Sequence, residues 1–131
     1  MLFRSEVAAL AKKFLAKAKA AGIDLAVTCT YRSPEDQAFL YSSGRTRPGK
    51  IVTNARPWRS WHQYRVAFDV VPIQNGKPVW NDKKLWIRIA EIGESVGLEA
   101  GARWRSITDY PHFQMTGGKT MSQLKIGRAH V

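Results

Sequence analysis

The sequence predicts an α+β fold in which helices flank a small antiparallel sheet. Two stretches repeat apolar residues at the spacing of a helix, one near the start of the chain and one in its later half. Short apolar runs that stop at proline or glycine lie between and after them, which is typical of strands. Asn75-Gly76, a residue pair typical of a tight hairpin turn, joins two of these runs. The chain has 131 residues, enough for one core, so we expect a single domain over residues 1–131.

The first helix is expected to begin at Ser5, as its cap, and to run to about Ala21, with Gly22 ending it. Its lysines lie mostly opposite an apolar stripe made of Val7, Leu10, Ala11, Phe14, Leu15 and Ala18. A basic amphipathic helix can also lie on a membrane surface. Because the stripe is rich in alanine, we favour packing on the domain. A buried strand over Ile23 to Tyr31 is expected next.

The second helix has a sharp start signal. Ser33 is placed to cap it, and Pro34 takes the first helical position, where a missing N–H costs nothing. The helix is expected to continue to Gly44. Residues 42–59 then form a long connection, which in a small domain is usually functional. We expect this connection to form one wall of a cleft.

The later elements alternate strand, helix and strand. Val66–Val71 reads as a strand bounded by Pro72. Asn81 or Asp82 is expected to cap a helix that ends at Gly97. The inner face of this helix is expected to hold Leu85, Trp86, Ile89, Ile92, Gly93 and Val96.

Two histidines and two aspartates stand out as a candidate metal site. Asp69 lies within the Val66–Val71 strand, where a lone buried carboxylate needs a partner or a metal. His62 precedes this strand, and His112 opens the last strand. Two imidazoles and one carboxylate form a catalytic zinc set, because a fourth position stays open for water. Asp109 is a spare carboxylate beside them, whereas His130, next to the end of the chain, is the poorest candidate ligand.

These residues carry a resemblance to a known family. Ser60-x-His62 with Ala67-x-Asp69, followed by Asp109-x-Pro111-His112-Phe113, resembles the signature of the zinc D-alanyl-D-alanine carboxypeptidases. That family includes VanY-like enzymes and the L-alanyl-D-glutamate endopeptidases used as phage endolysins. The resemblance runs from about Thr30 to Gln114. It implies the hedgehog and D-Ala-D-Ala peptidase fold, with Zn²⁺ held by His62, Asp69 and His112, and no separate cell-wall-binding domain.

The expected chemistry is metal-assisted peptide hydrolysis. Zinc lowers the pKa of its water from about 15.7 towards about 7, and Asp109 is expected to move that water's proton to the leaving amine. The resemblance implies that Arg32 polarises the scissile carbonyl or holds a substrate carboxylate. The residues expected to bind substrate are Ser60, Gln37 and Trp104.

Two positions depart from the family pattern. Relatives often have glycine where this chain has Trp58, and usually have glycine where it has Arg65. A bulky side chain is strained wherever the backbone needs a positive φ. We expect these positions to affect the loop and the substrate groove without removing a metal ligand.

The charge balance indicates a polyanionic partner. Lys and Arg total 21 and Asp and Glu total 10, a formal net charge of +11. A basic nucleic-acid-binding protein is the alternative from another class, but no helix-turn-helix or zinc-finger spacing is visible. A zinc-loaded inactive relative is disfavoured, because Asp109 supplies a base. We expect a monomer that meets the anionic bacterial envelope and has no specific nucleic-acid partner.

The setting follows from the start of the chain. Charged residues interrupt its first apolar stretch, unlike a signal peptide. We therefore expect a phage or prophage endolysin, held in the host cytoplasm until a holin releases it to the periplasm and cell wall. The expected bond is L-alanyl-D-glutamate in the peptidoglycan stem peptide, and the alternative is removal of the terminal D-alanine. Cys29, the single cysteine, is expected to be a small buried hydrophobe.

Overall fold

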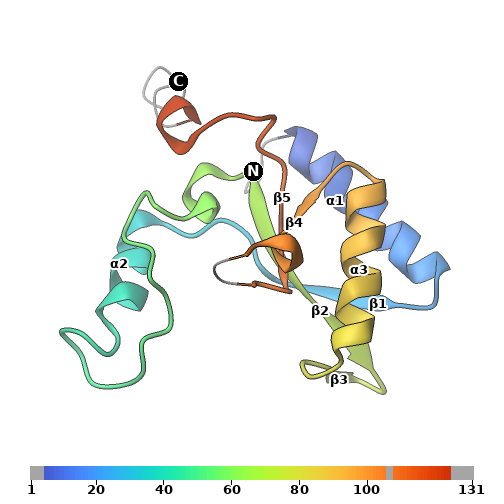
Figure 1. Cartoon of the computed structure of the whole chain (residues 1–131), viewed down its shortest axis with the longest axis horizontal. Coiled ribbons are helices and arrows are strands. Elements are labelled where there is room, and N and C mark those ends of the chain that lie inside the picture. Colours follow the sequence, from blue (N-terminus) through green and yellow to red (C-terminus); the bar gives the residue numbers. More distant parts are fainter. Residues whose placement is uncertain (1–4, 106–107, 125–131) are drawn as a thin grey trace.

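The computed structural model describes residues 5–105 and 108–124. At its centre is an antiparallel sheet in the order β1-β2-β5-β4, with β3 paired to β2 (Figure 1). The strands are β1 (Asp24–Cys29), β2 (Ala67–Gln74), β3 (Lys77–Pro78), β4 (Glu99–Ala100) and β5 (His112–Gln114). The α-helices are α1 (Ser5–Ala20), α2 (Pro34–Ser42) and α3 (Lys83–Ser95). The predicted α+β class is confirmed.

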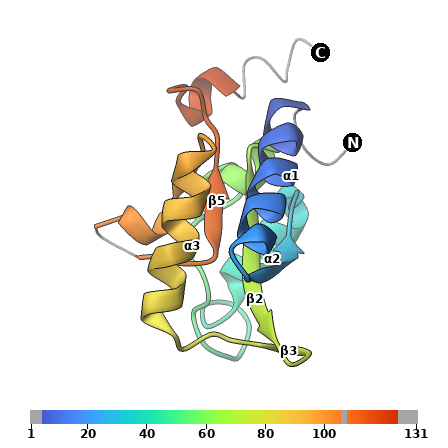
Figure 2. The ribbon, with the colours of Figure 1, turned by 90° about the vertical axis from the view of Figure 1, so that its right-hand side faces the viewer.

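One face of the sheet carries the hydrophobic core. Phe14 of α1 lies between Phe113 and Phe68, with ring centroids 4.6 Å and 6.2 Å away. Helix α3 packs so closely that a Cβ on Gly93 would stand 2.6 Å from Cε2 of Phe113. Figure 2 shows α1 and α3 packed along β2 and β5. The apolar stripes predicted for both helices therefore meet on this face.

The opposite face is polar because side chains alternate along a strand. Phe68 and Phe113 enter the core, so Asp69 and His112 point the other way. Asp69 is the direct partner of His112 on β5 and of Cys29 on β1. Three adjacent strands thus place Cys29, Asp69 and His112 in one row across the sheet.

Two strand predictions are wrong in detail. β1 is an edge strand, and none of its residues is fully buried. β2 does not stop at Pro72 but continues to Gln74. Pro72 stays within the strand: it is the direct partner of Leu25 on β1, and its carbonyl oxygen accepts the N–H of Val79 at 2.9 Å. The predicted turn is confirmed, because Asn75 and Gly76 both have positive φ, 53° and 76°.

The helix starts follow the predicted caps. The Ser33 hydroxyl accepts the N–H of Asp36 at 3.0 Å, and Asp82 accepts the N–H of Leu85 at 3.1 Å. Helix α2 ends at Ser42, before the expected Gly44. The side chain of Ser5 lies outside the described residues. Within the described part of the chain, no helix is long and apolar enough to span a membrane.

The segment after Thr116 is more than a polar tail. Residues 121–124 are helical, and Leu124 is 3% exposed against the core. Met121 lines the same pocket as the candidate ligands. His130 lies outside the described residues.

Candidate active site

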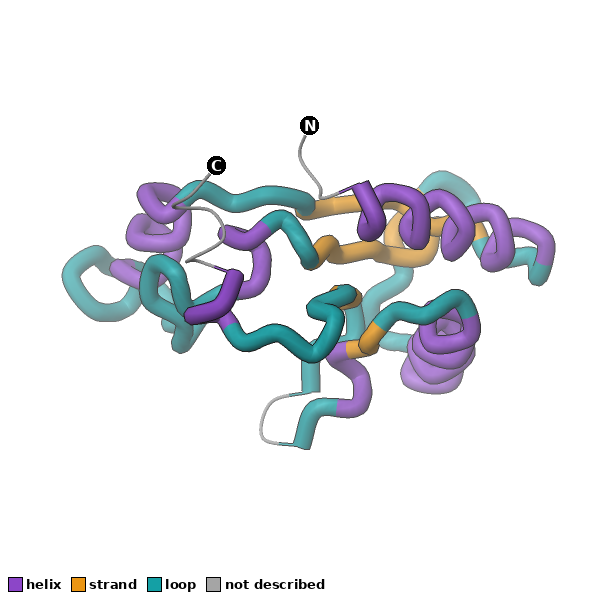
Figure 3. Tube along the Cα trace, turned by 90° about the horizontal axis from the view of Figure 1, so that it is seen from above, coloured by secondary structure: helices purple, strands orange, loops and turns teal. Residues whose placement is uncertain are grey.

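An open pocket of about 850 Å³ lies on the polar face of the sheet. Figure 3 shows α2 and its following connection at the end of the molecule away from α1 and α3. The connection supplies one wall, as predicted, through residues 51–55 and Arg59. The metal-site candidates and their neighbours line the rest: Arg32, Ser60, His62, Asp69, Trp104, Asp109 and His112.

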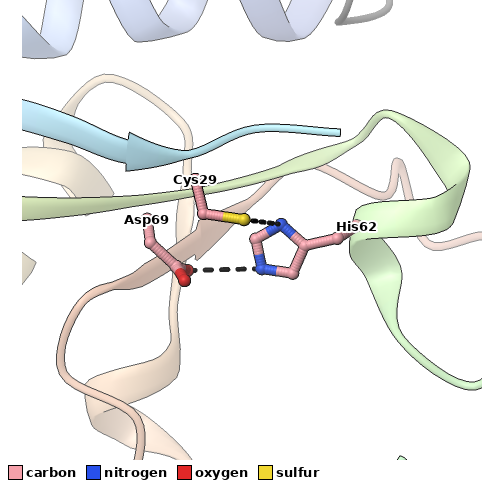
Figure 4. Close-up of side chains that lie close together, drawn as sticks. All are labelled: Cys29, His62 and Asp69. Atoms are coloured by element: carbon pink, nitrogen blue, oxygen red, sulfur yellow. Dashed lines mark hydrogen bonds and ion pairs between the residues drawn. The ribbon is translucent and has the colours of Figure 1, made fainter. Parts of the chain in front are cut away.

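His62 is held by a short 3-10 helix, Trp61–Tyr64. Ser60 caps this helix, because its hydroxyl accepts the N–H of His62 at 3.3 Å. Nδ1 of His62 lies 2.7 Å from the carbonyl oxygen of Thr30. A carbonyl only accepts, so Nδ1 carries the proton and Nε2 is the ring nitrogen left for a metal. Nε2 lies 3.3 Å from Oδ1 of Asp69 (Figure 4).

His112 approaches the same oxygen from the other side. Its Nδ1 lies 3.4 Å from Oδ1 of Asp69. Its Nε2 lies 2.7 Å from Oε1 of Gln114. This side-chain oxygen is the acceptor for His112, just as the Thr30 carbonyl oxygen is the acceptor for His62. Both histidines are buried, 4% and 3% exposed, so their orientations are set by these contacts and not by solvent.

The donor set fits a zinc ion. Oδ1 of Asp69 is buried, yet it has no hydrogen bond of acceptable geometry among the described residues. An unsatisfied buried carboxylate oxygen is costly unless a cation or donor meets it. In a tetrahedral zinc site with bonds of about 2.0–2.1 Å, neighbouring ligand atoms lie about 3.3–3.4 Å apart. The two nitrogen–oxygen distances match this spacing.

Without a metal, His62 and Asp69 shift each other's pKa values. Burial lowers the pKa of His62, but the contacts with Asp69 and Cys29 outweigh it and raise the pKa to about 10. Burial acts to raise the pKa of Asp69, and the two histidines instead hold it far below its usual range. The cluster is therefore a charged pair whose proton on His62 must leave when a metal binds.

Cys29 is not the buried hydrophobe expected from the sequence. It is half-buried, and its Sγ lies 3.7 Å from Nδ1 of His62 and 3.3 Å from Nη2 of Arg32. Figure 4 shows Cys29 and Asp69 approaching different nitrogens of the His62 ring. One potential ligand atom from each of these three residues lies within 4.8 Å of the others. Nδ1 of His62 faces both Thr30 and Cys29, so Cys29 lies on the side of the ring away from the proposed metal. The metal position lies on the Nε2 side, next to Asp69 and His112.

Asp109 stands at the pocket with the properties of a proton carrier. Burial raises its pKa, with nearby Asp69 adding to the rise and His112 opposing it. Its backbone N–H donates to the carbonyl oxygen of Gly101 at 3.0 Å. A Cβ on Gly101 would collide with the Asp109 carbonyl oxygen, so only glycine permits this approach. A carboxyl whose pKa is raised holds a proton more readily than a free aspartate does, which suits a group that accepts a proton and returns it.

Arg32 and Gln37 have different positions. Arg32 is half-buried and lines the pocket, as expected. Gln37 is fully buried and does not line the pocket, so the predicted contact with substrate is wrong. Its Oε1 accepts from Nη1 of Arg32 at 2.9 Å, and its Nε2 donates to the Ala55 carbonyl at 2.7 Å. Gln37 therefore aims Arg32 and ties α2 to the pocket wall.

Ser60 and Trp104 both line the pocket. The Trp104 ring lies 4.7 Å from that of His112 and covers one side of the metal position. The Ser60 hydroxyl is already engaged as the cap of the His62 helix. Trp104 therefore forms part of the pocket wall, whereas Ser60 holds the short helix that carries His62.

The two departures from the family pattern fall where the backbone has positive φ. Trp58 has φ 66° and Arg65 has φ 62°, both in the left-handed region. They flank the short helix that carries His62. Trp58 packs its ring 5.6 Å from Tyr64, and the Arg65 guanidinium lies 4.4 Å above the ring of Tyr31. These contacts offset a backbone conformation that glycine adopts without strain.

Sequence reasoning missed several residues of the site. Gln114 could have been found, because residues two apart in a strand share a face and Gln114 follows His112 at that spacing. Glu99 and the carbonyl of Thr30 leave no signal of their own in the sequence, since both reach the site through pairing between distant segments. Ile51 and Val52 form an exposed apolar part of the wall, 56% and 61% exposed.

Comparison with known proteins agrees with this site. Residues 53–115 match the model of a family described as D-alanyl-D-alanine carboxypeptidase. Over 103 residues the chain is 39% identical to the peptidoglycan L-alanyl-D-glutamate endopeptidase CwlK of Bacillus subtilis. That match covers 72% of this chain and 62% of the relative, so the chain spans less than two thirds of the relative's length.

Two solved structures show the same fold. The L-Ala D-Glu endopeptidase ChiX of Serratia marcescens superposes with a TM-score of 0.65 at 21% identity, over 88% of this chain and 81% of that one. The vancomycin resistance D,D-pentapeptidase VanY, solved in complex with Zn(II), gives 0.64 at 15% identity, over 93% and 77%. The matched segment contains His62, Asp69 and His112, the proposed ligands, and Asp109, the candidate base. Over the segment that holds the candidate site, the chain is thus similar to the D-alanyl-D-alanine carboxypeptidase family.

Proposed function

We propose that this chain is a zinc-dependent peptidoglycan endopeptidase that hydrolyses the L-alanyl-D-glutamate bond of the stem peptide. The observation that carries the proposal is the buried Asp69 oxygen, flanked by His62 and His112, with Asp109 in the same pocket. The bond choice is supported by the 39% identity to CwlK, whose name states that specificity.

The residues divide the work of hydrolysis between them. His62, Asp69 and His112 would hold zinc, which when bound supplies an acidified water and polarises the scissile carbonyl. Asp109 would accept a proton from the attacking water and return it to the leaving amine, a role that its raised pKa suits. Arg32, held by Gln37, donates hydrogen bonds to the carbonyl oxygen as charge develops on it. Trp104 and the 51–55 wall exclude bulk water from one side.

The test is mass spectrometry of the fragments released from purified Gram-negative peptidoglycan. We expect new amino-terminal D-glutamate with the wild type and none with Asp109→Ala. The Asp109→Ala protein should still bind zinc, because Asp109 is not among the proposed ligands. Fragments with intact L-alanyl-D-glutamate bonds, from a zinc-loaded wild type, would refute the proposed specificity.

A zinc D-alanyl-D-alanine carboxypeptidase is the second candidate, and the position of Arg32 favours it. Such an enzyme needs a cation for the free carboxylate of its substrate, and the half-buried Arg32 lines the pocket. Arg65 is a second cation near His62, but it stacks on Tyr31 and does not line the pocket. Release of free D-alanine in the same experiment would favour this activity.

For the biological setting, we propose an endolysin that waits in the host cytoplasm and reaches the cell wall after a holin opens the membrane. The formal net charge of +11 supports contact with the anionic envelope. Co-expression with a holin in a Gram-negative host should cause rapid lysis, and co-expression of Asp109→Ala should not. A monomeric state is part of the proposal and is measured by light scattering.

A further inference from the structure

We propose that Gln114 and Glu99 are positioning residues that hold His112 with Nδ1 directed at the metal. The inference rests on the proposed zinc site and adds two residues from outside the pocket wall. Gln114 lies on β5, two residues beyond His112, and Glu99 is its direct partner on β4. Neither residue lines the pocket, so their effect passes through His112.

The hydrogen bonds converge on Glu99, which accepts from Thr116 on one side and from Gln114 on the other. Oε2 of Glu99 accepts from the backbone N–H and the hydroxyl of Thr116, at 3.1 Å and 3.0 Å. Oε1 of Glu99 accepts from Nε2 of Gln114 at 3.2 Å. The amide of Gln114 therefore presents its oxygen to Nε2 of His112, 2.7 Å away. Each acceptor is paired with a donor. The order of donors and acceptors in this series of hydrogen bonds cannot be reversed, because the carboxylate of Glu99 can only accept.

This order decides which nitrogen of His112 can bind a metal. An amide oxygen only accepts, so Nε2 of His112 must carry the proton. Nδ1 then keeps its lone pair and faces Oδ1 of Asp69 at 3.4 Å. If the amide of Gln114 turned over, its NH₂ would face Nε2 and favour the proton on Nδ1, where it would block the ligand position. Glu99 prevents that rotation, because a carboxylate cannot donate to Gln114.

The two histidine ligands are thus held by different means. His62 is oriented by the main-chain carbonyl of Thr30, which no side-chain substitution removes. His112 depends on two side chains, one of them buried with 4% exposure and the other, Glu99, at the solvent-exposed end. Single substitutions at Gln114 or Glu99 can therefore weaken the metal site through His112 without replacing a ligand.

The experiment measures zinc affinity by competition with a chromophoric chelator and observes the His112 ring by ¹⁵N NMR in the zinc-loaded protein. Outer hydrogen-bond partners typically contribute about 10–100-fold to metal affinity. Gln114→Met, which keeps the size but removes the acceptor, should weaken zinc binding by about tenfold or more. It should also remove the slowly exchanging Nε2–H signal of His112. Gln74→Met, an exposed glutamine on β2, is the matched control and should change neither readout.

Glu99→Gln keeps shape and folding while removing the constraint on Gln114. The oxygen of the new amide would stay paired to Thr116, so its NH₂ would face the NH₂ of Gln114. Two donors repel each other, and the amide of Gln114 would rotate to present its oxygen instead. Zinc affinity should fall, whereas Glu91→Gln, an exposed control on α3, should leave it unchanged. The double variant Glu99→Gln with Gln114→Glu restores the order of donors and acceptors, because the amide at position 99 donates to the carboxylate at 114. Zinc affinity in the double variant should exceed that of Glu99→Gln.

The outcomes separate this inference from the proposed function. Equal zinc affinity and an unchanged His112 signal in Gln114→Met and Glu99→Gln would overturn the positioning role while leaving the zinc site intact. A wild type that binds no zinc would overturn both. Loss of zinc in both single variants without recovery in the double variant would show that packing, not hydrogen-bond order, matters at these positions.

Discussion

Asp69 and His112 are direct partners across β2 and β5, with Oδ1 of Asp69 3.4 Å from Nδ1 of His112. Strand pairing thus assembles two of the three proposed ligands before any metal arrives. His62, the third, is brought in by a separate loop helix and by the Thr30 carbonyl. The site is largely preorganised, and binding of zinc should stabilise the fold.

Metal removal is the first prediction. Chelation should abolish peptidoglycan cleavage and lower the melting temperature, because an ion that binds only the folded state stabilises it in proportion to the logarithm of its concentration. Zinc in excess over the chelator should restore both, as measured by fragment release and by scanning calorimetry. His112→Ala is the control, and its melting temperature should respond little to zinc. A wild-type melting temperature that does not respond to zinc would contradict the prediction.

Replacing the proposed base gives the second prediction. Asp109→Asn should lower kcat by about 10²–10⁴-fold, the usual contribution of general acid–base catalysis. KM and zinc content should change little, because the asparagine keeps the shape of a side chain that is not a ligand. Steady-state kinetics with a muropeptide substrate, together with metal analysis, checks this. A loss of zinc in this variant would mean that Asp109 belongs to the metal shell.

The third prediction concerns the pH dependence of the metal-free protein. The pKa of His62 is raised to about 10 in the folded state, against about 6.5 in an unfolded chain. The stabilisation that accompanies this shift is complete below the unfolded value and is lost as the pH rises through about 10. The free energy of unfolding of the chelated protein should therefore fall between pH 7 and pH 10 in urea titrations.

The control for this pH dependence is Asp69→Asn, which removes the charge that holds the proton on His62. Its unfolding free energy should fall much less over the same range. In the zinc-loaded wild type the metal has displaced the proton from Nε2, so the same decline should be absent. A chelated wild type whose stability stays level up to pH 10 would count against the ion pair between His62 and Asp69.

The left-handed backbone at Arg65 supports a fourth prediction. Arg65→Ala removes the stacking on Tyr31 but keeps the strain, whereas Arg65→Gly removes both. A left-handed conformation costs a non-glycine residue about 1–2 kcal/mol. Urea unfolding should therefore find Arg65→Gly more stable than Arg65→Ala by about 1 kcal/mol. Equal stabilities would show that the φ of 62° is not strained in this loop.

The sequence points to the proposed ligands but not to the residues that support them, for a physical reason. His62, Asp69, Asp109 and His112 are recognisable because metal chemistry restricts both residue type and spacing. The Gln114–Glu99 pair depends on the register between β4 and β5, which no local pattern encodes. Gln37, expected to bind substrate, is instead a buried residue that holds Arg32, and burial of a polar side chain is not encoded in the local sequence.

The same distinction explains the misjudged strands. β1 has an apolar composition, but it lies at the edge of the sheet, and composition does not reveal strand order. Pro72 looked like a boundary because proline interrupts a paired strand. Here β2 continues past it, because Pro72 pairs with Leu25 of β1 and its carbonyl oxygen accepts the N–H of Val79. Cys29 is near His62 only because β1 pairs with β2, a contact between segments far apart in the chain.

The two walls of the pocket are anchored differently, and their mobility should differ. Among the described residues, none from 27 to 57 contributes to the hydrophobic core, and α2 is joined to the body by the hydrogen bonds of one buried glutamine. Segments without apolar anchorage open locally at low free energy. We expect amide hydrogen exchange to be faster across α2 and its connection than across β2 and β5. The pocket would then widen on the α2 side alone. A bulky polymer that does not fit a rigid pocket could enter, while the proposed metal ligands keep their relative positions.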